Sequence, residues 1–335
     1  MIKSVEFKYF KVLRDATLPL SQFTLIVGPN GCGKTTALQG LLCLGGKLGI
    51  SYASVVSAGA RKDTPNASVS PRWGKPWDKF NVWFSWVPTL NPRLQFDTGG
   101  KPLHEEDLEA VLRELRSIEI YALDARAIAL PVHLEAEVRL ASDGKGLAGV
   151  LDRMRDNHPE RFEALNHDLG HWLPEFDRVL FETPQPGHRG ILLRTREGGY
   201  SIRAADLSQG TLLALTIMTL AWLPDPPSIV CFEEPDRGLH PRLLRDVRDA
   251  LYRLAYPEGF EEKRPPVQVI ATTHSPYMLD LFRDHPDEIV IANRDGDNVR
   301  FERLSDRKDL DEILRDSHLG DVWYSGILGG VPDAP

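Results

Sequence analysis

The sequence predicts an α/β fold, and three patterns along the chain carry that prediction. An apolar strand at 23–27 runs into a glycine-rich turn, and a helix with leucines at helical spacing follows the turn. An apolar strand at 228–232 and a second buried strand at 267–273 flank a helical pattern, which is typical of strands buried in a parallel sheet. Between these regions, residues 174–204 predict three short strands joined by turns, a small antiparallel unit.

Composition and charge exclude several classes of protein. The chain has 335 residues, 42% apolar and 26% charged, which is typical of a folded soluble protein and not of a low-complexity or collagen-like chain. Its 40 basic and 48 acidic residues give a net charge of -8, which argues against a broadly basic nucleic-acid coat but leaves room for a local basic groove. Three cysteines without paired spacing indicate neither disulfides nor zinc. Without a signal sequence, and with 211–223 too short to span a bilayer, we expect a cytoplasmic protein without a membrane segment.

The remaining elements follow from periodicity and turn residues. Residues 2–10 alternate as in a strand, and 51–100 predict a surface insertion with one strand at 79–87. A hairpin is expected over 288–304, with its turn at 295–298. Helices are expected at 35–46, 104–117, 147–173, 211–223, 240–255 and about 308–316, and a further strand at 118–123.

The glycine-rich turn has the spacing of a phosphate-binding loop. Residues 28–35, GPNGCGKT, fit G-x-x-x-x-G-K-[ST] and lie between the predicted strand and helix. Backbone N–H groups of such a loop surround a phosphate at a helix N-terminus, Lys34 can reach the β and γ phosphates, and the Thr35 hydroxyl can ligate Mg²⁺. The alternative is a glycine turn with a solvated lysine, which the flanking strand and helix disfavour.

Two adjacent carboxylates, Glu233 and Glu234, follow the apolar strand at 228–232. Ligands of a parallel sheet bind beyond the carboxyl ends of its strands, so we expect these acids to face the phosphate loop. By position, Glu233 is assigned to the metal and Glu234 to the attacking water. Without the phosphate loop, the same pair would indicate a solvated loop.

Two further segments can contact phosphate. His274 follows the strand at 267–273 and can donate a hydrogen bond to a γ-phosphate, although a capping or packed histidine fits the same pattern. Ser208 and Gly210 stand at the start of the helix expected at 211–223, where they make either an anion site or an ordinary N-cap.

The order of these segments resembles that of the ATP-binding-cassette (ABC) ATPases, in particular the RecF/SMC-like branch that includes the ATPase heads of the overcoming-lysogenization-defect (OLD) proteins. Residues 2–36 look like the start of that branch. LSQGT at 207–211 is similar to its signature, EEPDRGLHPRLL at 233–244 to its EEPxxxLHP stretch, and ATTHSP at 271–276 to its switch-histidine segment. The resemblance covers the whole chain and is weakest over 51–200.

This resemblance implies a P-loop NTPase fold of the ABC-head type, with a mixed central sheet, an antiparallel β lobe and a helical insertion. It implies a single domain over 1–335. Its parts would be a phosphate-loop lobe (1–50), an insertion with a helical and antiparallel lobe (51–200), the signature, Walker B and switch-histidine segments (201–290), and a C-terminal hairpin and tail (291–335).

The resemblance also implies Mg²⁺-dependent hydrolysis of ATP by a head-to-tail homodimer, with each ATP between the phosphate loop of one subunit and the signature of the other. Glu234, His274 and Lys34 would be catalytic, and Thr35 and Glu233 would hold Mg²⁺. The ATP-binding residues would be Gly28, Asn30, Gly31, Gly33, Lys34, Thr35 and Thr36, with Ser208 and Gly210 acting in trans.

The sequence departs from the transporter-type pattern of these ATPases. Glu233 stands where Asp is commoner, Thr211 where Gln is usual, and His240 at the usual D-loop aspartate position. No glutamine is assigned to the loop that senses Mg²⁺, for which Gln95 is the candidate. Asp295-Gly296-Asp297 looks like part of the Toprim nuclease site of OLD proteins, but Asp and Gly favour a turn there, so we expect no nuclease domain.

Three functions compete. The leading hypothesis is an ATPase whose cycle opens and closes a dimer and gates a separate effector protein or a DNA contact, in DNA repair or phage defence. The alternative is a nucleotide-sensing interaction protein with negligible turnover. The subunit of a membrane transporter is disfavoured by Thr211 and His240. DNA could be contacted by the stripe of Arg242, Arg245 and Arg248, although such a stripe is also typical of a solvated helix face.

Overall fold

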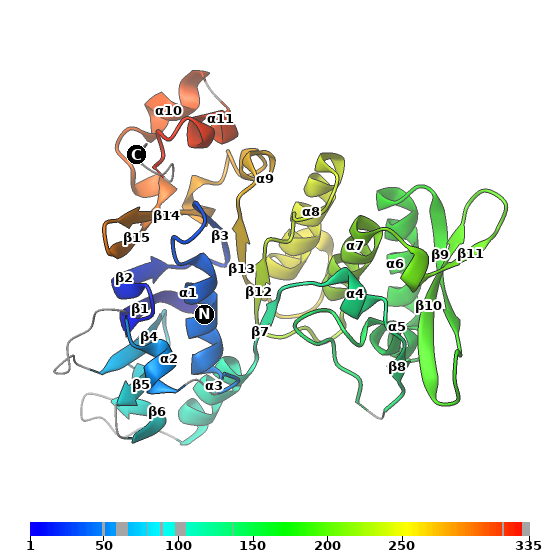
Figure 1. Ribbon diagram of the computed structural model, residues 1–335, viewed down its shortest axis with the longest axis horizontal. Helices are drawn as coiled ribbons and strands as arrows, with labels where there is room; N and C mark the ends of the chain where they lie inside the picture. Colours follow the sequence, from blue (N-terminus) through cyan, green and yellow to red (C-terminus); the bar gives the residue numbers. More distant parts are fainter. Residues whose placement is uncertain are drawn as a thin grey trace. The chain divides into compact units, whose positions relative to one another are not determined.

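A computed structural model describes residues 1–48, 51–57, 66–78, 80–87, 90–97, 105–135, 137–316 and 318–329, and it divides into two units (Figure 1). Unit 1 comprises Met1–Ile120, Pro227–Cys231 and Pro266–Pro335. Unit 2 comprises Tyr121–Pro226 and Phe232–Pro265.

A mixed six-stranded sheet runs in the order β15-β14-β3-β13-β12-β7. β3 pairs in parallel with β13 and β14, while β15 is antiparallel to β14, so the sheet is mixed as predicted. All residues of β3 and β13 are buried, which explains why neither sequence alternates between apolar and charged residues. The strands are β3 (Phe23–Val27), β7 (Ile118–Tyr121), β12 (Ile229–Glu233), β13 (Gln268–Thr273), β14 (Ile289–Asp295) and β15 (Asn298–Arg303).

A second, antiparallel sheet has the order β2-β1-β4-β5-β6. The interpretation of 51–100 as a surface insertion with one strand was wrong, because three strands form there and β4 pairs along β1. Residues of β4 and β5, among them Val69 and Trp86, are buried in the same core as Phe7 of β1. The strands are β1 (Ile2–Phe10), β2 (Leu13–Pro19), β4 (Ala67–Trp73), β5 (Asn81–Val87) and β6 (Leu90–Asp97). Residues 58–65, 79, 88–89 and 98–100 of the predicted insertion lie outside the described residues.

The helix after the phosphate loop, α1 (Lys34–Leu44), joins the cores of these two sheets. Its Leu38 and Leu41 pack in one buried cluster with Phe7 of β1 and Ile26 of β3. The helix lies close against β1, since a Cβ on Gly40 would come within 2.5 Å of the Phe7 ring. The other helices of unit 1 are α2 (Tyr52–Val55), α3 (Glu105–Arg116), α9 (Pro276–Asp280), α10 (Leu310–Asp316) and α11 (Leu319–Tyr324).

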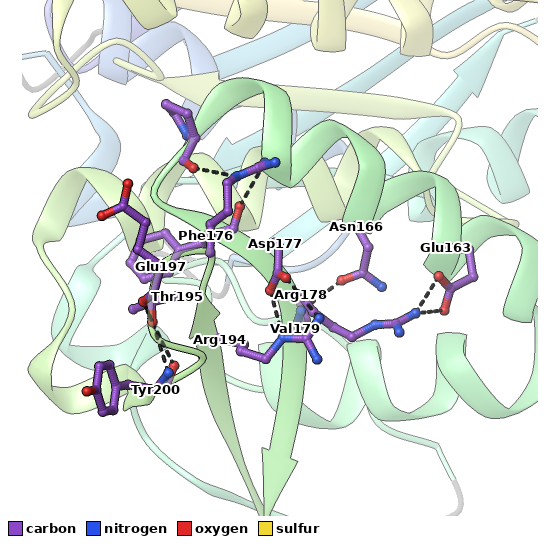
Figure 2. A network of polar contacts seen from close by, with 12 residues as sticks. Glu163, Asn166, Phe176, Asp177, Arg178, Val179, Arg194, Thr195, Glu197 and Tyr200 are labelled. Atoms are coloured by element: carbon purple, nitrogen blue, oxygen red, sulfur yellow. Dashed lines mark hydrogen bonds and ion pairs between the residues drawn. The ribbon is translucent and has the colours of Figure 1, made fainter.

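Unit 2 combines helices with the predicted antiparallel strands. Helix α7 is buried along its length from Thr211 to Ala221, which matches its almost wholly apolar sequence. In Figure 2, the buried Asn166 of α6 accepts a hydrogen bond from the backbone N–H of Val179 on β9 (2.8 Å), fastening the sheet to the helix. The elements are α4 (Ala125–Ile128), β8 (Val132–His133), α5 (Leu147–Asn157), α6 (Pro159–Trp172), β9 (Phe176–Glu182), β10 (His188–Thr195), β11 (Ser201–Arg203), α7 (Gln209–Ala221) and α8 (Leu244–Ala255).

No helix within the described ranges combines the length and the apolar character that a membrane-spanning helix needs.

Candidate functional site

The loop that connects β3 to α1 has the backbone that its glycines predict. Gly31 and Gly33 have positive φ angles of 78° and 87°, a conformation that side chains disfavour. A Cβ on Gly28 would lie 2.4 Å from the carbonyl oxygen of Ala292 on β14, so the loop starts in direct contact with the neighbouring strand. The loop therefore needs glycine both for its shape and for its close approach to the sheet.

Lys34, the first residue of α1, folds back into this loop. Its Nζ donates hydrogen bonds to the carbonyl oxygens of Gly28 (2.8 Å) and Pro29 (2.9 Å), and its side chain is buried. Gly33 precedes α1 without a side chain that could cap it, so the amides of the first helical turn receive no side-chain cap. A buried ammonium and uncapped helix amides in one loop fit a phosphate group.

The other predicted residues of the loop lie just before and just after Lys34 in the chain. Asn30 and Gly31 lie at the exposed tip of the loop, Thr35 is exposed in the first turn of α1, and Thr36 beside it is half-buried. The exposed hydroxyl of Thr35 is an oxygen donor of the kind that Mg²⁺ prefers, so the residues present fit the metal that the fold implies.

His274 belongs to the same edge of the mixed sheet as the loop. The last residue pair of β3 and β13 is Val27 with Thr273, so Gly28 and His274 leave two neighbouring parallel strands together. The segment after His274 is held by two hydrogen bonds, from Ser275 N to Thr273 Oγ1 (2.9 Å) and from Met278 N to Ser275 Oγ (3.3 Å). The half-buried His274 is thus set between a strand end and a capped helix turn.

In unit 2, Ser208 caps α7 as the sequence allowed. Its Oγ accepts a hydrogen bond from Thr211 N (3.1 Å) and lies 2.8 Å from Thr211 Oγ1. A Cβ on Gly210 would lie 3.1 Å from the carbonyl oxygen of Gly238, so the signature helix starts in close contact with the turn that precedes His240. His240 itself caps the next turn, accepting a hydrogen bond at Nδ1 from Arg242 N (3.2 Å).

The two predicted acids end β12 and begin the following turn. Glu233 is the last residue of the strand, and Glu234 has a φ of 49°, a region that non-glycine residues rarely occupy. The turn is closed by a hydrogen bond from Arg237 N to the Glu234 carbonyl (3.0 Å). Strained backbone of this kind is concentrated at functional sites, which agrees with the role predicted for Glu234.

Both acids line a pocket of about 640 Å³ within unit 2. Four further polar or charged residues line this pocket, and no role was expected for them from the sequence: Asp124, Arg126, Gln209 and Arg237. Asp124 and Arg126 follow β7, which lies next to β12 in the sheet. This adjacency brings them to the same pocket as the two acids, and it cannot be read from the local sequence. Gln95, the candidate for the Mg²⁺-sensing loop, lies on β6 of unit 1 opposite Trp83.

Comparison with known families agrees with this arrangement. Residues 80–280 match the family described as "AAA domain, putative AbiEii toxin, Type IV TA system", which is more than half of the chain. The chain belongs to this family. Residues 1–63, which contain the phosphate loop, match an AAA ATPase domain.

The chain is also similar to individual proteins with known names or structures. It is 24% identical to an OLD nuclease of Thermus scotoductus over 96% of this chain and 68% of the relative. Among solved structures, an SMC head bound to the C-terminal winged-helix domain of ScpA superposes with a TM-score of 0.64 at 18% identity, covering 90% of this chain and 96% of the other. A structure described as "the recombination mediator protein RecF-ATPrS in RecFOR pathway" gives a TM-score of 0.50 at 12% identity, covering 90% of this chain and 98% of the other.

These matches confirm the predicted fold class, an ABC-type P-loop ATPase head of the RecF/SMC/OLD branch, and the prediction that the chain binds and hydrolyses ATP. The Asp295-Gly296-Asp297 segment forms the tight turn between β14 and β15, with Asp295 paired to Asn298, as its composition predicted.

Proposed function

We propose that this ATPase is Mg²⁺-dependent, works as a head-to-tail dimer, and uses its nucleotide cycle to gate a partner effector or a DNA contact, in a DNA repair or phage-defence role. The observation that carries the proposal is the phosphate loop with its inward-facing Lys34 at the sheet edge where His274 also emerges. The 24% identity to an OLD nuclease supports the DNA-related role.

Each residue has a distinct task in this proposal. The loop amides and Lys34 bind the β and γ phosphates, and the Lys34 ammonium exchanges the carbonyls of Gly28 and Pro29 for phosphate oxygens. His274 donates a hydrogen bond to the γ-phosphate, and Glu234 orients the attacking water and accepts its proton. Thr35 and Glu233 are the oxygen donors for Mg²⁺, which when bound neutralises negative charge on the phosphates.

The dimer is supported by the exposure of the signature. Ser208 and Gln209 are exposed at the start of α7 although the rest of that helix is buried, so the signature is accessible to a second copy of the chain. In the proposed dimer, Ser208 and Gly210 of one copy complete the ATP site of the other.

The test is steady-state ATP hydrolysis with and without linear duplex DNA. Lys34→Ala removes the phosphate-binding ammonium and gives the background, and Lys263→Ala, which changes an exposed lysine, is its matched control. Hydrolysis above that background, stimulated by DNA, supports a DNA-gated ATPase. Hydrolysis without DNA stimulation supports a protein effector instead.

Glu234→Gln separates turnover from binding. The proposal expects this variant to bind ATP and to accumulate as an ATP-bound dimer in size-exclusion chromatography while its hydrolysis is lost, with the exposed Glu258→Gln as the control. A wild type whose rate equals the Lys34→Ala background, with Glu234→Gln changing nothing, would favour the nucleotide-sensing alternative.

A further inference from the structure

The pocket lined by Glu233 and Glu234 is also lined by two arginines, Arg126 from the short helix α4 that follows β7 and Arg237 from the turn after β12. Neither guanidinium makes a hydrogen bond or ion pair with any residue of the described ranges. The contacts of these two residues are made by their backbone N–H groups, to Asp124 Oδ1 (2.8 Å) and to the Glu234 carbonyl (3.0 Å). Two guanidinium groups thus line this pocket, and neither forms an ion pair with a carboxylate of the described residues.

Several other arginines of unit 2 are paired with carboxylates. Figure 2 shows Arg194 bound to Asp177 through two hydrogen bonds (2.8 and 2.9 Å) and Arg178 bound to Glu163. Arg161 and Arg253 share the buried Glu262 in the same way. Arg126 and Arg237 line one wall with Glu233 and Glu234 but pair with neither, which leaves their N–H groups available to an anion.

The chemistry of the proposed function supplies such an anion at this place. The water oxygen forms a bond to the γ-phosphorus, the bond from that phosphorus to the bridging oxygen breaks, and the bridging oxygen leaves with ADP. The proton of the water passes to Glu234. With Glu234 in this role, inorganic phosphate would form next to it. The carboxylates of Asp124, Glu233 and Glu234 line the same pocket and repel an anion, so cations in the pocket are needed to hold phosphate there.

We propose that Arg126 and Arg237 bind the inorganic phosphate cleaved from ATP and hold it in this pocket before release. The inference rests on the proposed function, because it takes Glu234 as the residue that activates water. It assigns to both arginines a role in product binding rather than in binding ATP.

The first experiment measures inhibition of steady-state hydrolysis by added inorganic phosphate in the full chain. We expect the inhibition constant to rise about tenfold in Arg126→Ala and in Arg237→Ala, and further in the double variant, because each loses charge-assisted hydrogen bonds. The KM for ATP should stay within about twofold. Arg300→Ala, which removes an exposed guanidinium that does not line the pocket, should behave as wild type. Arg126→Lys keeps the charge and should retain part of the phosphate binding.

A single-turnover experiment gives an independent reading. Cleavage is followed by acid quench and release by a fluorescent phosphate sensor, and the lag between the two should shorten in the double variant. The proposal would be overturned if a catalytically active double variant showed unchanged inhibition by phosphate and an unchanged lag between cleavage and release. It would also be overturned if the double variant lost as much affinity for ATP as for phosphate.

Direct calorimetric titration with inorganic phosphate in the presence of ADP keeps this inference separate from the proposed function. Phosphate binding that requires Arg126 and Arg237, in a protein that fails to hydrolyse ATP above the Lys34→Ala background, would reject the hydrolytic cycle but retain the anion site. Hydrolysis without arginine-dependent phosphate binding would reject the anion site alone.

Discussion

Val27 and Thr273 are register partners at the ends of the parallel strands β3 and β13, so the phosphate loop and His274 begin at the same level of one sheet edge. Gly28 follows the first of these residues and His274 the second. Because backbone pairing sets this relationship, substitution of the His274 side chain should change the chemistry of the edge without displacing the loop.

We predict that His274→Ala lowers kcat for ATP by about a hundredfold while KM changes little, because a hydrogen-bond donor to the γ-phosphate acts mainly as charge develops during cleavage. Steady-state kinetics test this, with the exposed His318→Ala as a control. Loss of ATP binding with kcat retained would instead assign His274 to ground-state binding.

The trans arrangement predicts complementation between two inactive variants. In a mixed dimer of Lys34→Ala and Ser208→Arg, one site carries both changes and the other carries neither, provided that Ser208 serves the partner copy. Mixing the two proteins after subunit exchange should therefore recover ATP hydrolysis. If Ser208 acted within its own subunit, every site of the mixed dimer would be defective and no activity would return.

The buried cysteines predict a pH dependence of stability. Burial raises the pKa of Cys43 from 9.0 to about 12, and the nearby charge of Lys11 acts in the opposite direction with a smaller effect. Since the folded-state pKa is the higher one, the stabilisation is complete below pH 9 and is lost as the pH rises from 9 towards 12. Urea unfolding across this range should show a smaller decline for Cys43→Ala than for wild type. Equal slopes would contradict the assignment.

Glu262 anchors the segment after α8 by accepting hydrogen bonds from Arg161 (2.8 Å) and Arg253 (3.0 Å). Its side chain is only 7% exposed, and Arg253 also stacks 4.0 Å from the ring centroid of Trp222. Glu262→Gln removes the charge that both arginines share, and should lower the free energy of unfolding by about 1–3 kcal/mol. The exposed Glu258→Gln should be neutral in the same urea titration, and an unchanged midpoint for Glu262→Gln would show that the pair is dispensable.

The local elements of this protein could be predicted because their signals are contained in short windows. The apolar run of β3, the glycines after it and the leucines of α1 define a strand, loop and helix without reference to any distant residue. The cap formed by Ser208 and the turn at 295–298 depend in the same way on the nearest residues.

The strands β4 and β6 could not be predicted so easily. β4 contains Pro71, which cannot donate to a sheet and lowers the expectation of a strand. In the structure Pro71 is buried opposite Val5 of β1, and Ala67, Val69 and Trp73 alternate with half-buried residues on the same inward face. Pairing with β1, far away in the sequence, stabilises a strand that its own composition does not favour.

The sequence by itself determined the phosphate loop, the acids after β12, the histidine after β13 and the α/β class, because backbone conformation and strand burial are encoded by neighbouring residues. Only the tertiary structure decided that β4–β6 extend the N-terminal sheet and that Arg126 and Arg237 line one pocket with Glu233 and Glu234. Local periodicity reports which side chains are buried but not which segments pair, and residues from separate turns meet only when the strands that carry them are neighbours in the sheet.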